Sequence, residues 1–315
     1  MITTAAGRGP VFDHPGLFYR DATGYLDAAV PFVRAGLAAD EPVMVAVPAA
    51  NLDLIRAAAG ADASRVVWHD MSRAGRNPGR IIGGVLLAFA AAHPGRRVRI
   101  IGEPIWPGRT ATEYPACAEH EALINRAFAG RDATILCPYD TRRLKPHVIA
   151  DAARTHPVIT TGGRTGASPQ YGDPAQVAAS FNLPLARPPA AAATLTVDLA
   201  HIRAARALVA DRGGAAGLRT DTIADLQVAV TELATNAIRH GVDGVGHLAV
   251  WADRTHLICQ MRSRGHLDDP LVGRTIPPND GESGRGLLLV HALCDLVRVH
   301  NGEHEVTINL YTDRP

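Results

Sequence analysis

The chain has 315 residues, enough for two ordinary domains, and its 47% hydrophobic and 20% charged residues are typical of globular proteins. With 32 basic and 31 acidic residues the formal net charge is +1, which gives no electrostatic argument for nucleic acid or an anionic membrane as a partner. The longest apolar run, residues 81–92, is shorter than the about 20 residues of a membrane span, and residues 1–5 do not begin a secretory signal.

Apolar β-rich runs alternate with helical patterns between residues 20 and 155. Strands are expected at 43–47, 66–68, 98–101 and 134–137. Helices are expected at about 21–38, 49–59, 78–92, 113–129 and 147–155. Strands this apolar, each followed by a helix, favour a parallel sheet that is covered on both faces. The sequence therefore predicts a doubly wound, mainly parallel α/β domain over residues 1–160.

Polar and aromatic side chains follow the expected strands of this domain. Ligands of such folds bind beyond the carboxyl ends of the strands, where this chain carries His69, Glu103, Trp106 and Tyr139. These four residues form a candidate ligand site. The structural alternative is that the aromatic side chains cap the core and the neighbouring acids cap helices. No Walker-type phosphate loop is present, so this domain has no motif of an ATPase.

The four cysteines are scattered and form no Cys-x-x-Cys motif. The only close Cys/His pair is Cys117-x-x-His120, for which a helix face with a buried thiol is the simpler interpretation of a possible metal site. A reducing cytoplasm is the expected location.

Residues 161–193 are rich in Pro, Gly, Ser and Ala and suit a linker with limited order. In the second domain, residues 194–315, strands are expected at 194–197, 246–252, 256–262, 296–300 and 305–311. Helices are expected at about 199–212, 221–240 and 285–296, the first of them broken at Gly213-Gly214. Asp221 is well placed to cap the second helix or complement its dipole, and Asn301-Gly302 signals the last hairpin. This order predicts an α/β sandwich with a mixed sheet.

The expected helix at 221–240 carries Glu232 and Asn236 four residues apart, with His240 one turn further, so all three share one face. An amide oxygen suits Mg²⁺, which prefers oxygen ligands, and a carboxylate can accept a proton. The alternative is a solvated glutamate and a surface asparagine. The segment Gly281-Glu282-Ser283-Gly284-Arg285-Gly286 favours the chemical interpretation. Glycines allow backbone N–H groups to approach phosphate, and a helix N-terminus follows.

In this order, the helix, the hairpin and the glycine-rich segment resemble the histidine-kinase-like (GHKL, Bergerat-type) ATPases, and within them the RsbW-like anti-sigma factor serine kinases. The resemblance covers residues 194–311. It implies that Glu232 is the general base, that Asn236 is the Mg²⁺ ligand, and that Gly284, Arg285 and Gly286 belong to the phosphate-binding lid of an ATP site. No His-bearing dimerisation hairpin precedes this module, which argues against an ordinary histidine kinase.

The hairpin departs from the family pattern at one position. Family members usually carry Asp-x-Gly, whose Asp accepts the adenine amino group, where this chain has Ser263-Arg264-Gly265. Replacing a charged acceptor by a hydroxyl should cost on the order of 1–2 kcal/mol. That is roughly a five- to thirty-fold loss of affinity. The resemblance therefore implies weakened ATP binding around Ser263 and Gly265.

Three stretches of the first domain, 98–106, 120–125 and 136–140, resemble MEDS sensory domains. That family is thought to sense small organic ligands and is paired with RsbW-like modules in actinobacterial regulators. The resemblance implies a sensor that controls a kinase module. The module would phosphorylate an anti-sigma-factor antagonist, sequester a sigma factor, or do both, and it would form a homodimer.

Two alternatives to the kinase stay open. The chain could be a non-catalytic binder of a sigma factor or antagonist that uses ATP weakly or not at all, as Ser263 allows. It could also hydrolyse nucleotide to drive an unrelated conformational switch.

Overall fold

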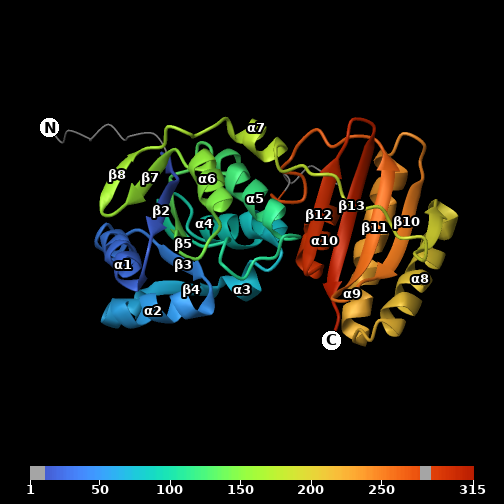
Figure 1. Cartoon of the computed structure of the whole chain (residues 1–315), viewed down its shortest axis with the longest axis horizontal. Coiled ribbons are helices and arrows are strands. Elements are labelled where there is room, and N and C mark those ends of the chain that lie inside the picture. The colour runs from blue at the N-terminus through green and yellow to red at the C-terminus, as the bar shows by residue number, and fades with distance from the viewer. Residues whose placement is uncertain (1–10, 277–284) are drawn as a thin grey trace. The chain divides into compact units, whose positions relative to one another are not determined.

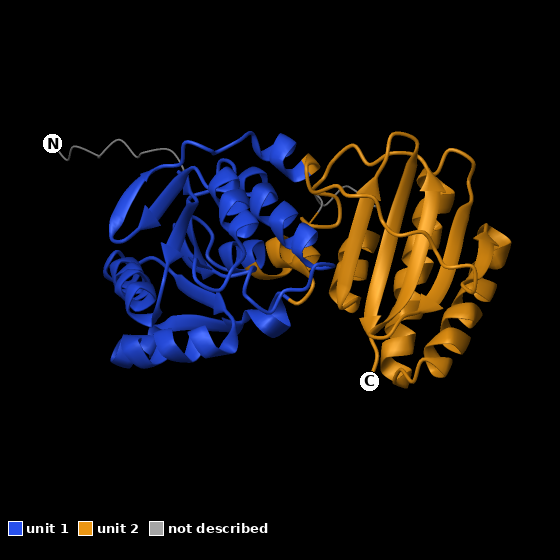
Figure 2. Cartoon of the chain, viewed as in Figure 1, with its two compact units in different colours: residues 1–75, 86–178 blue, residues 76–85, 179–315 orange. Residues whose placement is uncertain are grey.

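The computed structural model describes residues 11–276 and 285–315. The chain forms two compact units, coloured separately in Figure 2. Unit 1 comprises residues 1–75 and 86–178, and unit 2 comprises residues 76–85 and 179–315. Within the described residues, no helix is both long enough and apolar enough to cross a bilayer.

Unit 1 is built on a sheet with the strand order β4-β3-β5-β6-β2-β7-β8, with β1 also paired to β6 (Figure 1). Its strands are β1 (Phe12–Asp13), β2 (Pro15–Tyr19), β3 (Val43–Val47), β4 (Val66–Asp70), β5 (Val98–Gly102), β6 (Ala133–Asp140), β7 (Val158–Thr161) and β8 (Arg164–Ala167). Its α-helices are α1 (Ala22–Ala38), α2 (Ala49–Ala59), α3 (Met71–Ala74), α4 (Ala88–Ala91), α5 (Tyr114–Ala127), α6 (Pro146–Thr155) and α7 (Pro174–Ala179). The recorded pairs are parallel except β7–β8. This confirms the predicted doubly wound, mainly parallel α/β fold.

The central strands agree with the prediction because both of their faces are covered. Every residue of β3 and of β6 is buried, so these strands are nearly continuous apolar runs. The strands beyond β6, from β2 to the edge strand β8, were missed. β2 contains Pro and Gly, and β8 is exposed along its whole length, so neither has the apolar pattern of a central strand. The predicted linker 161–193 also contains β8 and α7, so part of it is regular structure.

The predicted helix 78–92 is not one regular helix. It is a 3₁₀ turn (Pro78–Arg80), a π-helix (Ile82–Leu87) and the short α4. Residues 76–85 group with unit 2 although the sequence places them in the first domain. Asn77, fully buried, donates a hydrogen bond from Nδ2 to the His291 carbonyl at 2.9 Å, and a methyl group on Gly79 would overlap the His291 ring. These contacts are long-range, so no local pattern could predict them.

Unit 2 is a five-stranded sheet with the order β12-β13-β11-β10-β9 and helices against one face (Figure 1). Its strands are β9 (Ala193–Val197), β10 (Gly246–Ala252), β11 (His256–Arg264), β12 (Leu296–Asn301) and β13 (Glu305–Asp313). Its helices are a 3₁₀ turn (Leu199–His201), α8 (Ile202–Ala215), α9 (Thr220–His240) and α10 (Arg285–Leu293). Apolar residues from all three α-helices and all five strands form one core. This two-layer arrangement is the predicted α/β sandwich.

The prediction of a mixed sheet in unit 2 was wrong, because the four strand pairs that the structure describes are all antiparallel. A single helix between two strands returns the chain parallel to the first strand. Here two helices, α8 and α9, connect β9 to β10, and the extra reversal of the chain makes β10 antiparallel to β9. The α10 crossover does return β12 in the direction of β11. However, β13 lies between those two strands and pairs with both.

The predicted break at Gly213-Gly214 was also wrong, since α8 continues to Ala215. A Cβ atom on Gly213 would lie 2.9 Å from Cγ1 of Ile223 on α9. The glycine therefore permits close packing of the two helices rather than ending the first one.

Candidate functional site

The predicted chemistry of α9 lies beside a buried stripe of the same helix. Leu226, Val230 and Leu233 pack into the core of unit 2, which fixes the rotation of the helix about its axis. The helix ends before Gly241, where a methyl group would overlap the Ala237 carbonyl oxygen. Asp221 lies in the first turn and accepts a hydrogen bond from the Thr222 N–H at 2.8 Å, near the positive end of the helix.

A cavity of about 460 Å³ lies beside this helix. Its volume is in the range of small-molecule sites. Among the predicted residues, Asn236, Ser263 and Gly265 line it, and His240 lines it as well. The rest of its wall consists of Leu233, Ala237, Gly241, Met261, Arg264, His266, Leu267, Asp268, Asp269, Val272, Leu287, Val306 and Ile308. One face of α9, the end of β11 and the loop after it therefore enclose a common space.

Asn236 is half-buried, and its side chain makes no hydrogen bond that the structure records among the described residues. An amide in this position can offer its oxygen to a ligand without first breaking an internal contact. The opposite wall, which follows β11, is fixed by Asn301 at the end of β12. Asn301 accepts from the Leu267 N–H at 2.9 Å and donates to the Leu267 carbonyl at 2.8 Å. Gly265 has φ = 148°, in the region that favours glycine.

Glu232 does not line the cavity but lies against the first turn of α10. A methyl group on Gly286 would overlap its carboxylate oxygen Oε2. The carboxylate and the positive end of α10 therefore face each other, as the sequence predicts for a base beside a phosphate-binding segment. Arg285 is exposed at the start of the same helix, whereas Gly284 lies outside the described residues.

Two acidic residues of the cavity wall were missed. Asp268 and Asp269 line the same space as Ser263, and Asp269 also accepts the Leu271 N–H at 3.0 Å. The sequence signal that could have indicated them is their position, since they follow shortly after the end of β11, whose last residues line the same cavity.

The four candidate residues of unit 1 lie in different surroundings. Glu103 is fully buried and accepts hydrogen bonds from Asn51 Nδ2 at 2.8 Å and from the Tyr25 hydroxyl at 3.4 Å. Tyr139 is fully buried and its ring meets that of His156 edge-on, with the ring centroids 5.5 Å apart. Trp106 is half-buried beneath the Arg109 guanidinium, 3.7 Å from the ring centroid, and His69 is exposed. Their grouping into one ligand site stays a prediction.

The environment of Glu103 makes the stability of unit 1 depend on pH. Burial raises the pKa of its carboxyl from an ordinary 4.5 to about 8, against the opposing hydrogen bonds from Asn51 and Tyr25. The folded state therefore favours the protonated form. Its contribution to stability is complete below about pH 4.5 and is lost as the pH rises through about 8. Each unit between the two pKa values corresponds to about 1.4 kcal/mol.

We expect Glu103→Gln to remove this part of the pH dependence, because the amide is neutral at every pH. Urea unfolding of unit 1 can be followed by the fluorescence of Trp68 and Trp106 in a Trp251→Phe background. As the pH rises from 5 to 8, the urea concentration at the unfolding midpoint should decrease for the wild type relative to Glu103→Gln. Parallel profiles for the two proteins would show that Glu103 is ionised throughout.

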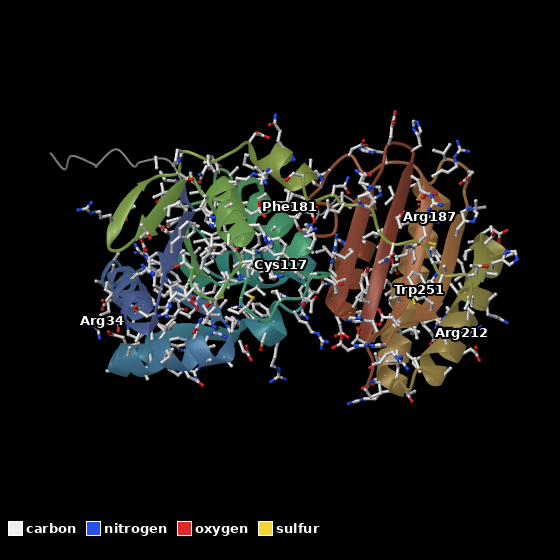
Figure 3. The ribbon with its side chains drawn as sticks, in the orientation of Figure 1. Arg34, Cys117, Phe181, Arg187, Arg212 and Trp251 are labelled. Atoms are coloured by element: carbon white, nitrogen blue, oxygen red, sulfur yellow. The ribbon has the colours of Figure 1, made fainter. Side chains whose placement is uncertain are left out.

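The pair Cys117 and His120 lies on α5, where both side chains are fully buried (Figure 3 labels Cys117). Within the described ranges, neither belongs to a group of three or more potential metal ligands.

Comparisons with known proteins match the chain in two segments. Residues 13–157 match the family model of the MEthanogen/methylotroph, DcmR Sensory (MEDS) domain. Residues 195–311 match that of the histidine kinase-like ATPase domain. No curated protein matches significantly.

Among solved structures, the crystal structure of the RsbU and RsbW domains of Rv1364c from Mycobacterium tuberculosis is 21% identical, with a TM-score of 0.30. The match covers 39% of this chain and 33% of that one, and a likeness of this size carries no argument. The two family matches lie on the two folds described above and leave only short segments unassigned. The chain therefore joins a MEDS sensory domain to a histidine kinase-like ATPase domain.

Proposed function

We propose that unit 2 binds Mg²⁺ and ATP and transfers the γ-phosphate to a serine of a partner protein, as an RsbW-like anti-sigma factor kinase would. The observation that supports this proposal is the pairing on α9. Asn236 lines an open cavity, and one turn earlier Glu232 lies against Gly286 in the first turn of α10. This arrangement would let Asn236 act as a metal ligand and Glu232 as a base for the terminal phosphates.

In the proposed reaction, Asn236 Oδ1 would hold Mg²⁺, an ion that prefers oxygen ligands. The partner's serine oxygen attacks the γ-phosphorus while Glu232 accepts the hydroxyl proton. The bond to the bridging oxygen breaks, and the electron pair leaves with ADP. Arg285 and the N–H groups of the first turn of α10, together with Gly284, stabilise the charge on the transferred phosphoryl group.

Ser263, where family members usually carry Asp, lies in the cavity wall at the end where we propose that adenine binds. A Ser263→Asp variant should bind ATP about five- to thirty-fold more tightly, because a charged acceptor replaces a hydroxyl. Calorimetric titration with ATP and Mg²⁺ measures the change. Thr194→Asp, at an exposed position of β9 and outside the cavity wall, controls for the added charge. Unchanged affinity in Ser263→Asp would place adenine elsewhere, with Asp268 and Asp269 as the remaining carboxylates of this cavity.

The partner that we propose is an anti-sigma-factor antagonist, a sigma factor, or both in turn. The MEDS domain would bind a small organic ligand and control this activity in the cytoplasm, and the ATPase domain would pair as a homodimer. The net charge of +1 gives no electrostatic argument for a nucleic-acid partner.

The proposal is tested by incubating the full chain with γ-labelled ATP, Mg²⁺ and candidate antagonist proteins. Phosphoserine on the partner supports the kinase. Rapid ATP turnover without any partner would instead support a nucleotide-driven switch and would overturn the proposal.

A second function is favoured by one observation, Ser263 at the position of the family's adenine-binding Asp. A non-catalytic module would hold a sigma factor or antagonist with little use of nucleotide. A stable complex whose affinity is the same with and without ATP, and no phosphoserine in the experiment above, would support this alternative.

A further inference from the structure

Four potential metal ligands meet in the interior of unit 1. His14 precedes β2, Glu121 lies on α5, Cys137 on β6, and His156 immediately after α6. Each side chain is at most 1% exposed. One donor atom from each residue lies within 4.8 Å of the donor atoms of the other three. Four parts of the chain thus bring two imidazoles, a carboxylate and a thiol to one point.

The spacing of these atoms fits a four-coordinate ion. His14 Nε2 is 3.4 Å from Glu121 Oε2 and 3.3 Å from Cys137 Sγ, and His156 Nε2 is 3.2 Å from Glu121 Oε2. Tetrahedral zinc with bonds of about 2.0–2.3 Å holds its ligand atoms roughly 3.3–3.7 Å apart. Three of the six pairs of donor atoms therefore have this spacing, and the other pairs lie within 4.8 Å.

The outer nitrogens of both imidazoles are already engaged. His156 Nδ1 lies 2.8 Å from the Ala152 carbonyl, which can only accept, so Nδ1 carries the proton. His14 Nδ1 lies 3.1 Å from Asn125 Oδ1, and the amide of Asn125 is oriented because its Nδ2 donates to the Thr155 carbonyl at 2.9 Å. Both rings therefore direct the Nε2 lone pair inward, as metal-binding histidines do.

Several polar atoms at the centre of the cluster are buried without a hydrogen bond of normal geometry, and the Tyr139 hydroxyl beside Glu121 is one of them. Neither carboxylate oxygen of Glu121 has a hydrogen bond of normal geometry, and neither does Nε2 of His156, although all three atoms are buried. A buried carboxylate that faces nitrogen lone pairs is unfavourable unless a cation or a proton lies between them. A divalent ion bound to one carboxylate and one thiolate would also have no net charge, which suits a fully buried centre.

We propose that His14, Glu121, Cys137 and His156 form a closed, four-coordinate site for one zinc ion. The mixture of imidazole, thiolate and carboxylate ligands suits zinc, and a site with four protein ligands and no open position is structural rather than catalytic. Binding releases the thiol proton of Cys137 to solvent. The ion would link the segment before β2 to α5, β6 and the end of α6, and so tie the N-terminal segment of unit 1 to its central sheet.

The site is tested by measuring zinc in the full chain, purified with zinc and dialysed against a weak chelator. We expect one zinc per chain by mass spectrometry, and its loss in Cys137→Ser. The matched control is Cys259→Ser, which removes another fully buried strand cysteine and should retain the metal. Cobalt substitution gives a second measurement. A thiolate-to-cobalt charge-transfer band should form in the wild-type chain and in Cys259→Ser but not in Cys137→Ser.

A positioning variant keeps the test decisive if Cys137→Ser does not fold. Asn125 contacts no metal in this proposal but orients His14, so Asn125→Ala should weaken zinc binding roughly 10- to 100-fold. The change is measured by competition with a chromophoric chelator, with folding checked by circular dichroism. If the wild-type chain takes up neither zinc nor cobalt beyond the level of Cys137→Ser, the cluster shares protons only and the proposal is wrong.

Discussion

Replacing Asn236 with alanine should lower the affinity for ATP in the presence of Mg²⁺ at least about 100-fold, equivalent to about 2.7 kcal/mol. Alanine offers no oxygen to an ion that demands nearly ideal octahedral coordination, and Asn236 is the amide of α9 that lines the cavity. Calorimetric titration with and without Mg²⁺ measures the effect. The loss should be confined to the Mg²⁺-dependent part of binding.

The matched control is Gln227→Ala, which removes another amide from α9. Gln227 Nε2 donates to the Arg206 carbonyl at 3.0 Å and lies outside the cavity wall. We expect this variant to bind nucleotide as the wild type does. Equal affinity in all three proteins would contradict the role assigned to Asn236.

The second large effect concerns Glu232. Glu232→Gln should slow phosphoryl transfer about 10²- to 10⁴-fold, the usual contribution of a general base. The amide has nearly the same shape beside Gly286 but cannot accept the serine proton. Single-turnover formation of phosphoserine on the partner, at saturating ATP, measures the rate. The affinity for ATP should change little, because Glu232 is not part of the cavity wall.

Glu305→Gln provides the control, since Glu305 is a half-exposed glutamate of β13 whose nearest basic partner is Arg262 at 3.7 Å. It should transfer phosphate at the wild-type rate. A full rate in Glu232→Gln would exclude Glu232 as the base. A loss of ATP binding in that variant would instead assign the residue to nucleotide recognition.

Local patterns predicted those parts of the fold whose burial is either uniform or regularly periodic along the chain. The strand Val43–Val47 and the helix Thr220–His240 were predicted to within one residue, because a fully covered strand is apolar throughout and an amphipathic helix repeats every 3.6 residues. The exposed strand β8 and the short β2 carry neither pattern. The packing role of Gly213 depends on Ile223 of the next helix, so the local helix-breaking tendency of glycine gave the wrong answer there.

The sequence by itself determined which chemical groups α9 carries and that Glu232 and Asn236 share a face, because a helix puts residues four apart on one side. Only the tertiary structure decided what faces them. The cavity wall, with Ser263, Asp268 and Asp269, comes from β11 and the loop after it, and Gly286 comes from α10. The same holds for His14 and His156, which are 142 positions apart in the chain yet have ring centroids 4.2 Å apart. Contacts of this kind arise from the closing of a sheet and the packing of its helices, which bring distant segments together in a way that no local spacing records.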